Sequence, residues 1–189
     1  MSIIEVVAVV FGLVCVWLTV RENIWCWPTG LVMVALYIVI FLRAKLYSDM
    51  GLQVVYVFMQ IYGWYNWLHG GKDKGELKVT RMTRVGIILW SIVGICGTAG
   101  LGFVMDTYTD ASLAYWDAAT TVLSLIAQWL MAKKLLESWV VWIIVDVLCV
   151  GVYTVKGLYL TTGLYAIFLG LATAGLLTWR KSYLKTQPA

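Results

Sequence analysis

The sequence predicts an all-α integral membrane protein with seven transmembrane helices in a 3+1+3 arrangement. Of its 189 residues, 62% are hydrophobic and only 13% are charged, which is far from the composition of a soluble domain. Several apolar runs are long enough to cross about 30 Å of hydrocarbon at about 1.5 Å per helical residue. A repeat with a fixed spacing of 112 residues also relates the first part of the chain to the last. Together these observations indicate two three-helix units joined by one extra helix.

The predicted spans follow one another along the whole chain. They cover residues 3–20, 24–42, 47–68, 85–105, 113–131, 139–155 and 158–177. The first run has no basic segment before it and no small-residue cleavage site, and a second run follows within a few residues. We therefore expect the first run to remain as a helix rather than to be a cleaved signal peptide.

The basic residues predict the direction in which the chain crosses the membrane, because cytoplasmic loops of membrane proteins carry an excess of Lys and Arg. Most of the basic residues fall on one side: Arg21, Lys72, Lys74, Lys78, Arg81, Arg84, Lys133, Lys134, Arg180, Lys181 and Lys185. The other side has only Arg43, Lys45 and Lys156. We therefore expect the N-terminus outside the cell and the C-terminus in the cytoplasm.

Similar residues at the 112-residue spacing predict the domain organisation. The more specific pairs are Trp17 with Trp129, Arg21 with Lys133, Trp27 with Trp139, Gly63 with Gly175, and Trp67 with Trp179. We expect a first three-helix repeat at residues 1–68, a basic cytoplasmic loop at 69–84, a linker helix with an outer loop at 85–111, and a second three-helix repeat with the C-terminal tail at 112–189. Because the single linker helix restores the direction of entry, the two repeats are expected to run parallel, as in transporters with parallel repeats.

Polar and aromatic side chains at helical spacing mark helix faces that point away from lipid, because a polar group in hydrocarbon is costly. The candidate substrate-binding residues on these faces are Trp139, Trp142, Asp146 and Tyr153 in the sixth span, Asp117 and Gln128 in the fifth, Gln53, Tyr56 and Gln60 in the third, and Tyr37 in the second. Indole and phenol rings attract organic cations and stack on planar rings. The set is typical of a site for a flat, positively charged, polar solute.

Asp146 is the strongest single candidate. It lies about 10 Å into the membrane from Trp139, and no Lys or Arg lies at a similar depth in any predicted span. The carboxylate must therefore be protonated, hydrogen bonded, hydrated or paired with a cation from solution. Most of these options require a cavity or a bound solute, so a functional role is favoured.

Several polar and aromatic residues also have a structural interpretation. Trp27 and Trp179 lie near predicted helix ends, where interfacial aromatic anchors are common, and we interpret them as anchors. Gln53 and Gln60 can equally join helices through hydrogen bonds. Ser124 can bond back to a carbonyl of its own helix, and this structural use is favoured for it.

The sequence has no pattern typical of an enzyme, a metal site or a cofactor site. Its single histidine, His69, lies outside the spans, and no Lys at mid-membrane depth is available to hold retinal. No H-E-x-x-H motif is present. The four cysteines form no C-x-x-C pair and are expected to be reduced packing residues. We expect no catalytic residue, no metal, no cofactor and no nucleic-acid partner.

The chain resembles the Pnu family of bacterial vitamin transporters in the segments NIWCWPTGLV, AKLYSDMGLQ, IYGWYNW, and WVVWIIVDV with the later KGLYLTTGLYAIFLG. The likeness covers nearly the whole chain, and the pair Trp139 and Trp142 is among its more specific features. The resemblance implies a 3+1+3 fold related to sugar transporters of the SWEET type, with a substrate site midway across the bacterial inner membrane. It also implies facilitated diffusion of a B-type vitamin, foremost nicotinamide riboside, which intracellular phosphorylation then traps.

The identity of the vitamin stays open within this resemblance. The family includes thiamine and riboflavin transporters, and many riboside-transporting relatives have Asn at the position of Asp146. One alternative is therefore a thiamine transporter, since thiamine is also a planar cation. Another is the substrate-binding subunit of a larger ATP-driven importer. The expected partners are the vitamin and the lipid bilayer, and small-xxx-small spacings in the fourth span leave a homo-oligomer open.

Overall fold

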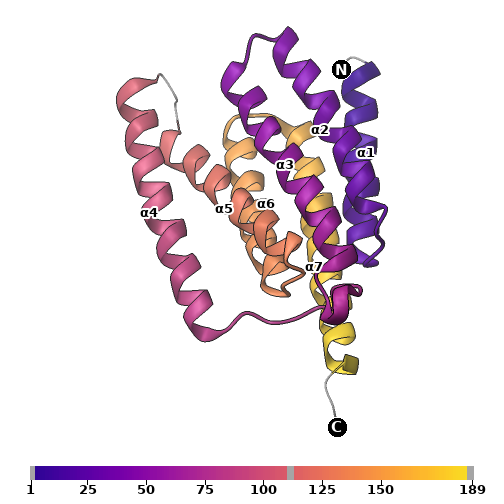
Figure 1. The fold of residues 1–189 in the computed structure, drawn as a ribbon. Helices are drawn as coiled ribbons and strands as arrows, with labels where there is room; N and C mark the ends of the chain where they lie inside the picture. The colour runs from indigo at the N-terminus through magenta and orange to yellow at the C-terminus, as the bar shows by residue number, and fades with distance from the viewer. Residues whose placement is uncertain (1–2, 110–112, 187–189) are drawn as a thin grey trace. The chain divides into compact units, whose positions relative to one another are not determined.

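The structure is a computed structural model that describes residues 3–109 and 113–186. These residues form seven α-helices (Figure 1), which are α1 (Ile3–Val20), α2 (Cys26–Arg43), α3 (Tyr47–His69), α4 (Arg84–Tyr108), α5 (Ala114–Ala132), α6 (Glu137–Val155) and α7 (Tyr159–Thr186). A short 3-10 helix, η1 (Lys72–Lys74), lies in the loop after α3. The prediction of an all-α chain with seven helices is confirmed.

The helix bounds follow the apolar runs of the sequence. The first helix has the predicted bounds, and most other ends lie within about three residues of the prediction. The exception is α7, which continues to Thr186 instead of ending at residue 177. Arg180 and Lys181 prolong this helix, because a helix can extend beyond the hydrocarbon where water solvates its charged side chains. The apolar run, by contrast, ends where the hydrocarbon ends.

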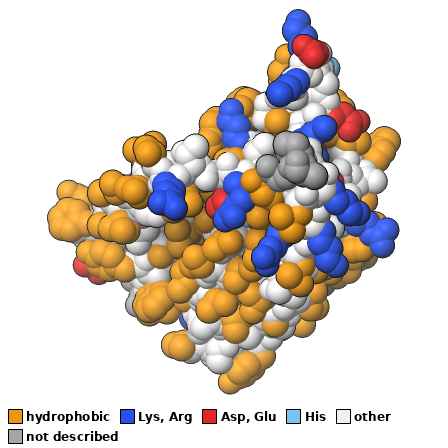
Figure 2. Space-filling model, turned by 90° about the horizontal axis from the view of Figure 1, so that it is seen from below, with side chains coloured by type: hydrophobic (Ala, Val, Ile, Leu, Met, Phe, Trp, Pro, Cys, Tyr) orange, Lys and Arg blue, Asp and Glu red, His pale blue; other side chains and the backbone are white. Residues whose placement is uncertain are grey.

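Five of the described helices are both long and apolar enough to cross a membrane, namely α1, α2, α4, α6 and α7. The other two, α3 with 23 residues and α5 with 19, are long enough to span about 30 Å. Their lower hydropathy comes from the polar residues that the sequence singled out, such as Gln60 in α3 and Gln128 in α5. Figure 2 shows hydrophobic side chains over much of the visible face, with Lys and Arg among them. The chain is a multi-pass membrane protein.

The chain divides into two compact units. Unit 1 consists of Met1–Val79, Ala132–Lys134 and Leu177–Ala189. Unit 2 consists of Thr80–Met131 and Leu135–Leu176. The predicted boundary between residues 111 and 112 lies outside the described residues, and the predicted domain limits stay a prediction.

The core of unit 1 is built around three tryptophans. In this unit α2 packs against both α1 and α3 (Figure 1). Trp27, Trp67 and Trp179 are only 2%, 3% and 0% exposed. The Trp67 ring meets the Trp27 ring edge-on at 5.2 Å and the Trp179 ring at 5.7 Å. Trp179 Nε1 also donates a hydrogen bond of 3.0 Å to the carbonyl of Thr19. The interpretation of Trp27 and Trp179 as interfacial anchors is therefore wrong, because protein encloses both rings.

Each unit has a tryptophan that packs on a glycine of the neighbouring helix. In unit 1, a Cβ atom at Gly63 of α3 would overlap the Trp27 ring of α2. In unit 2, a Cβ atom at Gly175 of α7 would lie 2.6 Å from the Trp139 ring of α6. The missing side chain of glycine therefore allows both helix pairs to approach closely.

The turns between helices use left-handed backbone conformations at matching places. Glu22, after α1, has a φ of 55°, and Lys134, after α5, has a φ of 53°. Lys45, after α2, has a φ of 58°, and Gly157, after α6, has a φ of 70°. The members of each pair are separated by the same 112 residues as the sequence repeat. The left-handed region of φ and ψ is costly for residues with a Cβ atom, so the same costly conformation at corresponding turns indicates that both turns have the same backbone geometry.

Candidate functional site

The middle of α6 places a buried carboxylate between aromatic residues. Asp146 is 4% exposed. It shares a face of α6 with Trp142, one turn before it, and with Tyr153, two turns after it, and both of these side chains are partly buried. Within the described residues, no Lys or Arg forms an ion pair with Asp146. A carboxylate in this setting requires a proton, hydrogen bonds, water or a cation from solution.

The part of α7 that belongs to unit 2 adds aromatic rings near this face. The Tyr165 ring stacks on Tyr153 with centroids 5.3 Å apart and planes at 18°. Phe168 meets Tyr165 edge-on at 6.0 Å. Cys149, whose side chain is 5% exposed, lies about one turn after Asp146 on α6. The carboxylate therefore lies in a cluster formed by two helices.

Tyr165 and Cys149 were missed in the sequence, although two signals point to them. Tyr165 stands 112 residues after Gln53, which the polar stripe of the third span had singled out. Cys149 lies three residues after Asp146 and so continues the polar stripe of the sixth span. All four cysteines are free thiols, but Cys96 is exposed, so the predicted packing role is wrong for that residue.

Trp139 packs inside unit 2. Its side chain is 2% exposed and lies against Gly175. Trp142, three residues later, is the less enclosed member of the tryptophan pair. The geometry therefore gives Trp139 a packing role, and its contact with a solute stays a prediction.

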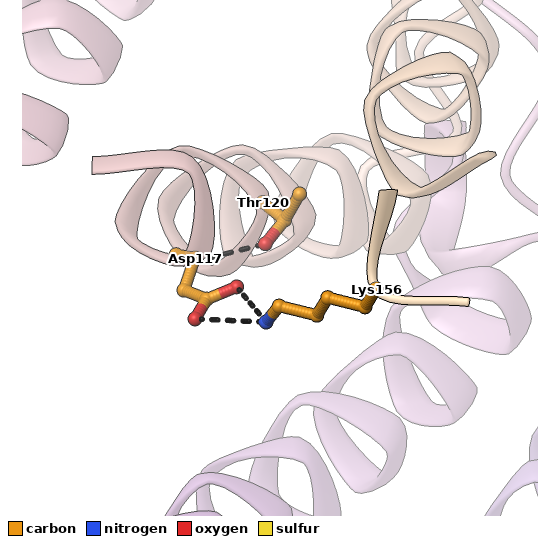
Figure 3. Close-up of polar contacts among 3 residues, drawn as sticks. All are labelled: Asp117, Thr120 and Lys156. Atoms are coloured by element: carbon orange, nitrogen blue, oxygen red, sulfur yellow. Dashed lines mark hydrogen bonds and ion pairs between the residues drawn. The ribbon is translucent and has the colours of Figure 1, made fainter. Parts of the chain in front are cut away.

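Asp117, in the first turn of α5, has a cation of its own within unit 2. Lys156 Nζ lies 3.4 Å from Asp117 Oδ1 and 3.5 Å from Oδ2 (Figure 3). The Lys156 and Asp117 side chains are 30% and 35% exposed. Thr120 donates a hydrogen bond of 3.0 Å to the Asp117 carbonyl, within the helix. Asp117 is thus a paired and partly exposed carboxylate, unlike Asp146, and its role in binding stays a prediction.

The rest of the polar stripe on α5 is partly explained by the helix itself. Ser124 Oγ donates a hydrogen bond of 3.0 Å to the Thr121 carbonyl, so the structural interpretation of Ser124 is confirmed. Gln128 is partly buried on the same helix. Its role in binding stays a prediction.

The remaining candidate residues lie in unit 1. Gln60 is 5% exposed, and its amide packs on Gly30 of α2, where a Cβ atom would collide with it. Gln60 therefore packs where α2 and α3 meet, and its use in hydrogen bonds between helices stays a prediction. Tyr37 stacks on an aromatic ring of its own helix, with centroids 5.7 Å apart. Gln53 and Tyr56 are partly buried on α3. As binding residues, these four stay a prediction.

The geometry of unit 2 suits recognition of a solute. A buried carboxylate beside partly buried aromatic rings can hold a planar organic cation through charge, stacking and cation–π contacts. Among the residues that the structure describes, no group of three or more His, Cys, Asp or Glu side chains could hold a metal ion. Long apolar helices with a candidate site of this kind are typical of a membrane transporter.

The chain belongs to the nicotinamide mononucleotide transporter family, whose model matches residues 2–181. This is a family of transporters and not of enzymes. The expected Pnu relationship is thereby confirmed.

Two curated relatives are similar over most of their length. The nicotinamide riboside transporter PnuC of Escherichia coli (strain K12) is 28% identical over an alignment of 207 residues. The alignment covers 96% of this chain and 87% of that protein. The riboflavin/roseoflavin transporter RibM of Streptomyces davaonensis is 26% identical over 186 residues, which cover 93% of this chain and 83% of that protein. A crystal structure of the vitamin B3 transporter PnuC superposes with a TM-score of 0.77 at 26% identity, covering 97% of this chain and 83% of that chain.

Proposed function

We propose that this protein carries nicotinamide riboside into the cell by facilitated diffusion, and that phosphorylation inside the cell traps the vitamin. The substrate class is supported by the similarity to nicotinamide riboside and vitamin B3 transporters. Facilitated diffusion and trapping are carried over from the resemblance to the Pnu family. The observation that carries the proposal for this chain is the buried Asp146 beside Trp142 and Tyr153, a charge partner that relatives with Asn at this position lack. Nicotinamide riboside has a planar pyridinium ring with a fixed positive charge, which a carboxylate attracts and aromatic faces stack on.

The same carboxylate favours the riboside over the mononucleotide. The mononucleotide adds a phosphate group, and a second anion is repelled by a buried carboxylate. Neither α6 nor residues 159–176 of α7 contain a Lys or Arg to offset that repulsion. We therefore expect the mononucleotide to bind more weakly than the riboside.

Riboflavin is the second candidate substrate, because RibM is a riboflavin/roseoflavin transporter. Riboflavin is planar and can stack on the same rings, but it is uncharged and gains nothing from the charge of Asp146. Thiamine, the alternative that the sequence left open, is a cation and can use the carboxylate. The order of affinities among these vitamins therefore separates the candidates.

We also propose a 3+1+3 SWEET-like arrangement, with α1–α3 and α5–α7 as two parallel repeats and α4 as the linker. Three observations support it. The helix bounds correspond at the 112-residue spacing: α1 ends at Val20 and α5 at Ala132, and α3 begins at Tyr47 and α7 at Tyr159. The left-handed turn residues correspond in the same way. So do the two tryptophans that pack on glycine.

The proposed orientation places the N-terminus outside the cell and the C-terminus in the cytoplasm, with the protein in the bacterial inner membrane. The basic loop after α3 and the basic end of α7 support it, because such residues are retained on the cytoplasmic side.

Purified protein in liposomes tests the transport proposal. We expect labelled nicotinamide riboside to enter until its internal concentration equals the external one, without ATP or an ion gradient. Unlabelled riboside should compete more strongly than riboflavin or the mononucleotide, and thiamine is the cationic comparison. Accumulation above the external level, driven by a proton or sodium gradient, rejects facilitated diffusion. Binding without any flux supports the alternative of an importer subunit.

A further inference from the structure

The turn between α5 and α6 contains a lysine whose charged end is buried. Lys134 Nζ lies 3.1 Å from Oε2 of Glu22, which belongs to the turn between α1 and α2. The Lys134 and Glu22 side chains are only 10% and 22% exposed. The same ammonium group lies 4.6 Å from the centre of the Trp67 ring, within the range of a cation–π contact. Glu22 and Trp67 thus satisfy a charge that is rarely buried without a partner.

The two residues before Lys134 are also held by α3. The Asn66 side-chain amide donates a hydrogen bond of 2.9 Å to the Ala132 carbonyl. Lys133 Nζ lies 5.0 Å from the centre of the Tyr62 ring. The segment Ala132–Lys134 therefore belongs to unit 1, although the residues directly before and after it belong to unit 2.

Three features of this attachment make it releasable. A buried ion pair adds little net stability, because removing both charges from water costs about as much as their attraction contributes. A pocket of about 370 Å³ adjoins the pair and gives the lysine side chain room to move; its lining includes Glu22, Trp25, Trp67, Glu76 and Lys134. The φ angles of Glu22 and Lys134, 55° and 53°, are also conformations that residues with a Cβ atom adopt at a cost.

We infer that Glu22, Lys134 and Trp67 form a latch at the proposed cytoplasmic side, which opens once in each transport cycle. The inference rests on the proposed function, because alternating access requires one side of a transporter to close while the other opens. In the closed state the ion pair keeps the α5–α6 turn in unit 1. When the pair breaks, the long Lys134 side chain can extend its ammonium group to water, and the turn is free to move with α5 and α6.

A reversible cross-link tests the latch in the full-length protein. In the double variant Glu22→Cys/Lys134→Cys, a bifunctional methanethiosulfonate reagent should join the two turns, and mass spectrometry should show the link. We expect exchange of labelled nicotinamide riboside across liposomes to fall about tenfold or more when the latch is locked, and dithiothreitol to restore it. Affinity for the riboside, measured by calorimetry, should stay within about twofold. The matched controls are Glu22→Cys alone and Lys134→Cys alone, each with the four native cysteines and treated with the same reagent, which should exchange as before.

Each other outcome of the cross-linking overturns the latch. Unchanged exchange in the linked protein means that the turns need not separate. Loss of both exchange and affinity means that the pair only maintains the fold. If the untreated wild type shows no exchange, the proposed transport is rejected. That result is distinct from a failure of the latch, because it does not depend on whether the two turns separate.

A second variant removes both charges at once, so that neither partner is left buried and unpaired. In Glu22→Gln/Lys134→Met, nothing remains to hold the latch by charge, and exchange should be at least as fast as in the wild type. Arg81→Gln is the control for loss of a charge elsewhere, because Arg81 is the 59% exposed partner of an ion pair with Glu137 in unit 2. Exchange in the double variant that is as slow as in the cross-linked protein contradicts the latch.

Discussion

Replacing Asp146 with Asn tests the central electrostatic claim. Asn keeps the size and much of the hydrogen-bonding shape of Asp but removes its charge. At 4% exposure the carboxylate is poorly screened by water. For a pyridinium charge about 4 Å away and an effective dielectric constant of about 20, the Coulomb attraction is about 4 kcal/mol. Because the amide dipole of Asn retains part of it, we expect a loss of about 2 to 4 kcal/mol, or about 30- to 1,000-fold in affinity.

The assay is titration calorimetry on detergent-purified protein with two ligands. Nicotinamide riboside carries the charge, whereas its reduced dihydro form is neutral and nearly the same shape. The difference between the two losses isolates the charge term, because packing changes affect both ligands alike. A structural Asp146 predicts that both affinities shift together, and a double difference indistinguishable from zero refutes the counter-ion role.

Asp117→Asn is the matched control for this experiment. It makes the same chemical change in the same unit, but at a carboxylate that is 35% exposed and already paired with Lys156. Exposed ion pairs contribute about 0 to 1 kcal/mol, so the riboside affinity should change by less than about fivefold. A loss as large as that of Asp146→Asn would move the charge recognition to the first turn of α5.

Three further predictions concern the surroundings of this site. Trp142→Ala should weaken riboside binding by about 1 to 3 kcal/mol if the indole stacks on the ring, and Trp142→Phe should retain part of the affinity. Stacking is excluded if calorimetry shows that the folded Ala variant binds the riboside as tightly as the wild type. Gly175→Ala should lower thermal stability, because overpacking against Trp139 costs about 1 to 3 kcal/mol. Gly170→Ala, with no heavy atom within 4 Å of the added carbon, should not, and equal melting temperatures for the two variants contradict the packing argument. Lys156→Gln should cost less than about 1 kcal/mol in unfolding free energy, with a smaller effect at high salt; a larger, salt-independent loss would show a buried pair.

The helices could be predicted from the sequence because the hydrocarbon thickness fixes the length of an apolar run. The same signal could not locate the end of α7, since a helix that enters water no longer needs apolar residues. It also could not distinguish a tryptophan at the membrane surface from one enclosed by protein. Trp27 was assigned wrongly for this reason, although Gly63 on the next helix is the small residue that a buried ring requires.

The site was only partly predictable for a related reason. Helical spacing on α6 identified Asp146 with Trp142 and Tyr153, because residues of one helix face can be read from their separation alone. Contacts between helices depend on packing that no local pattern encodes. The stacking of Tyr165 on Tyr153 and the pairing of Asp117 with Lys156 therefore required the structure.

The pairing of Glu22 with Lys134 also bears on the history of the chain. The two residues stand 112 positions apart, so each is the counterpart of the other in the proposed repeats, yet they contact each other at 3.1 Å. In an assembly of two identical three-helix chains, a position that meets its own counterpart brings two identical residues together. Two glutamates or two lysines there would repel each other. Opposite charges can meet at such a position only when the two copies differ in sequence, so in the proposed repeats this ion pair requires that the copies had already diverged.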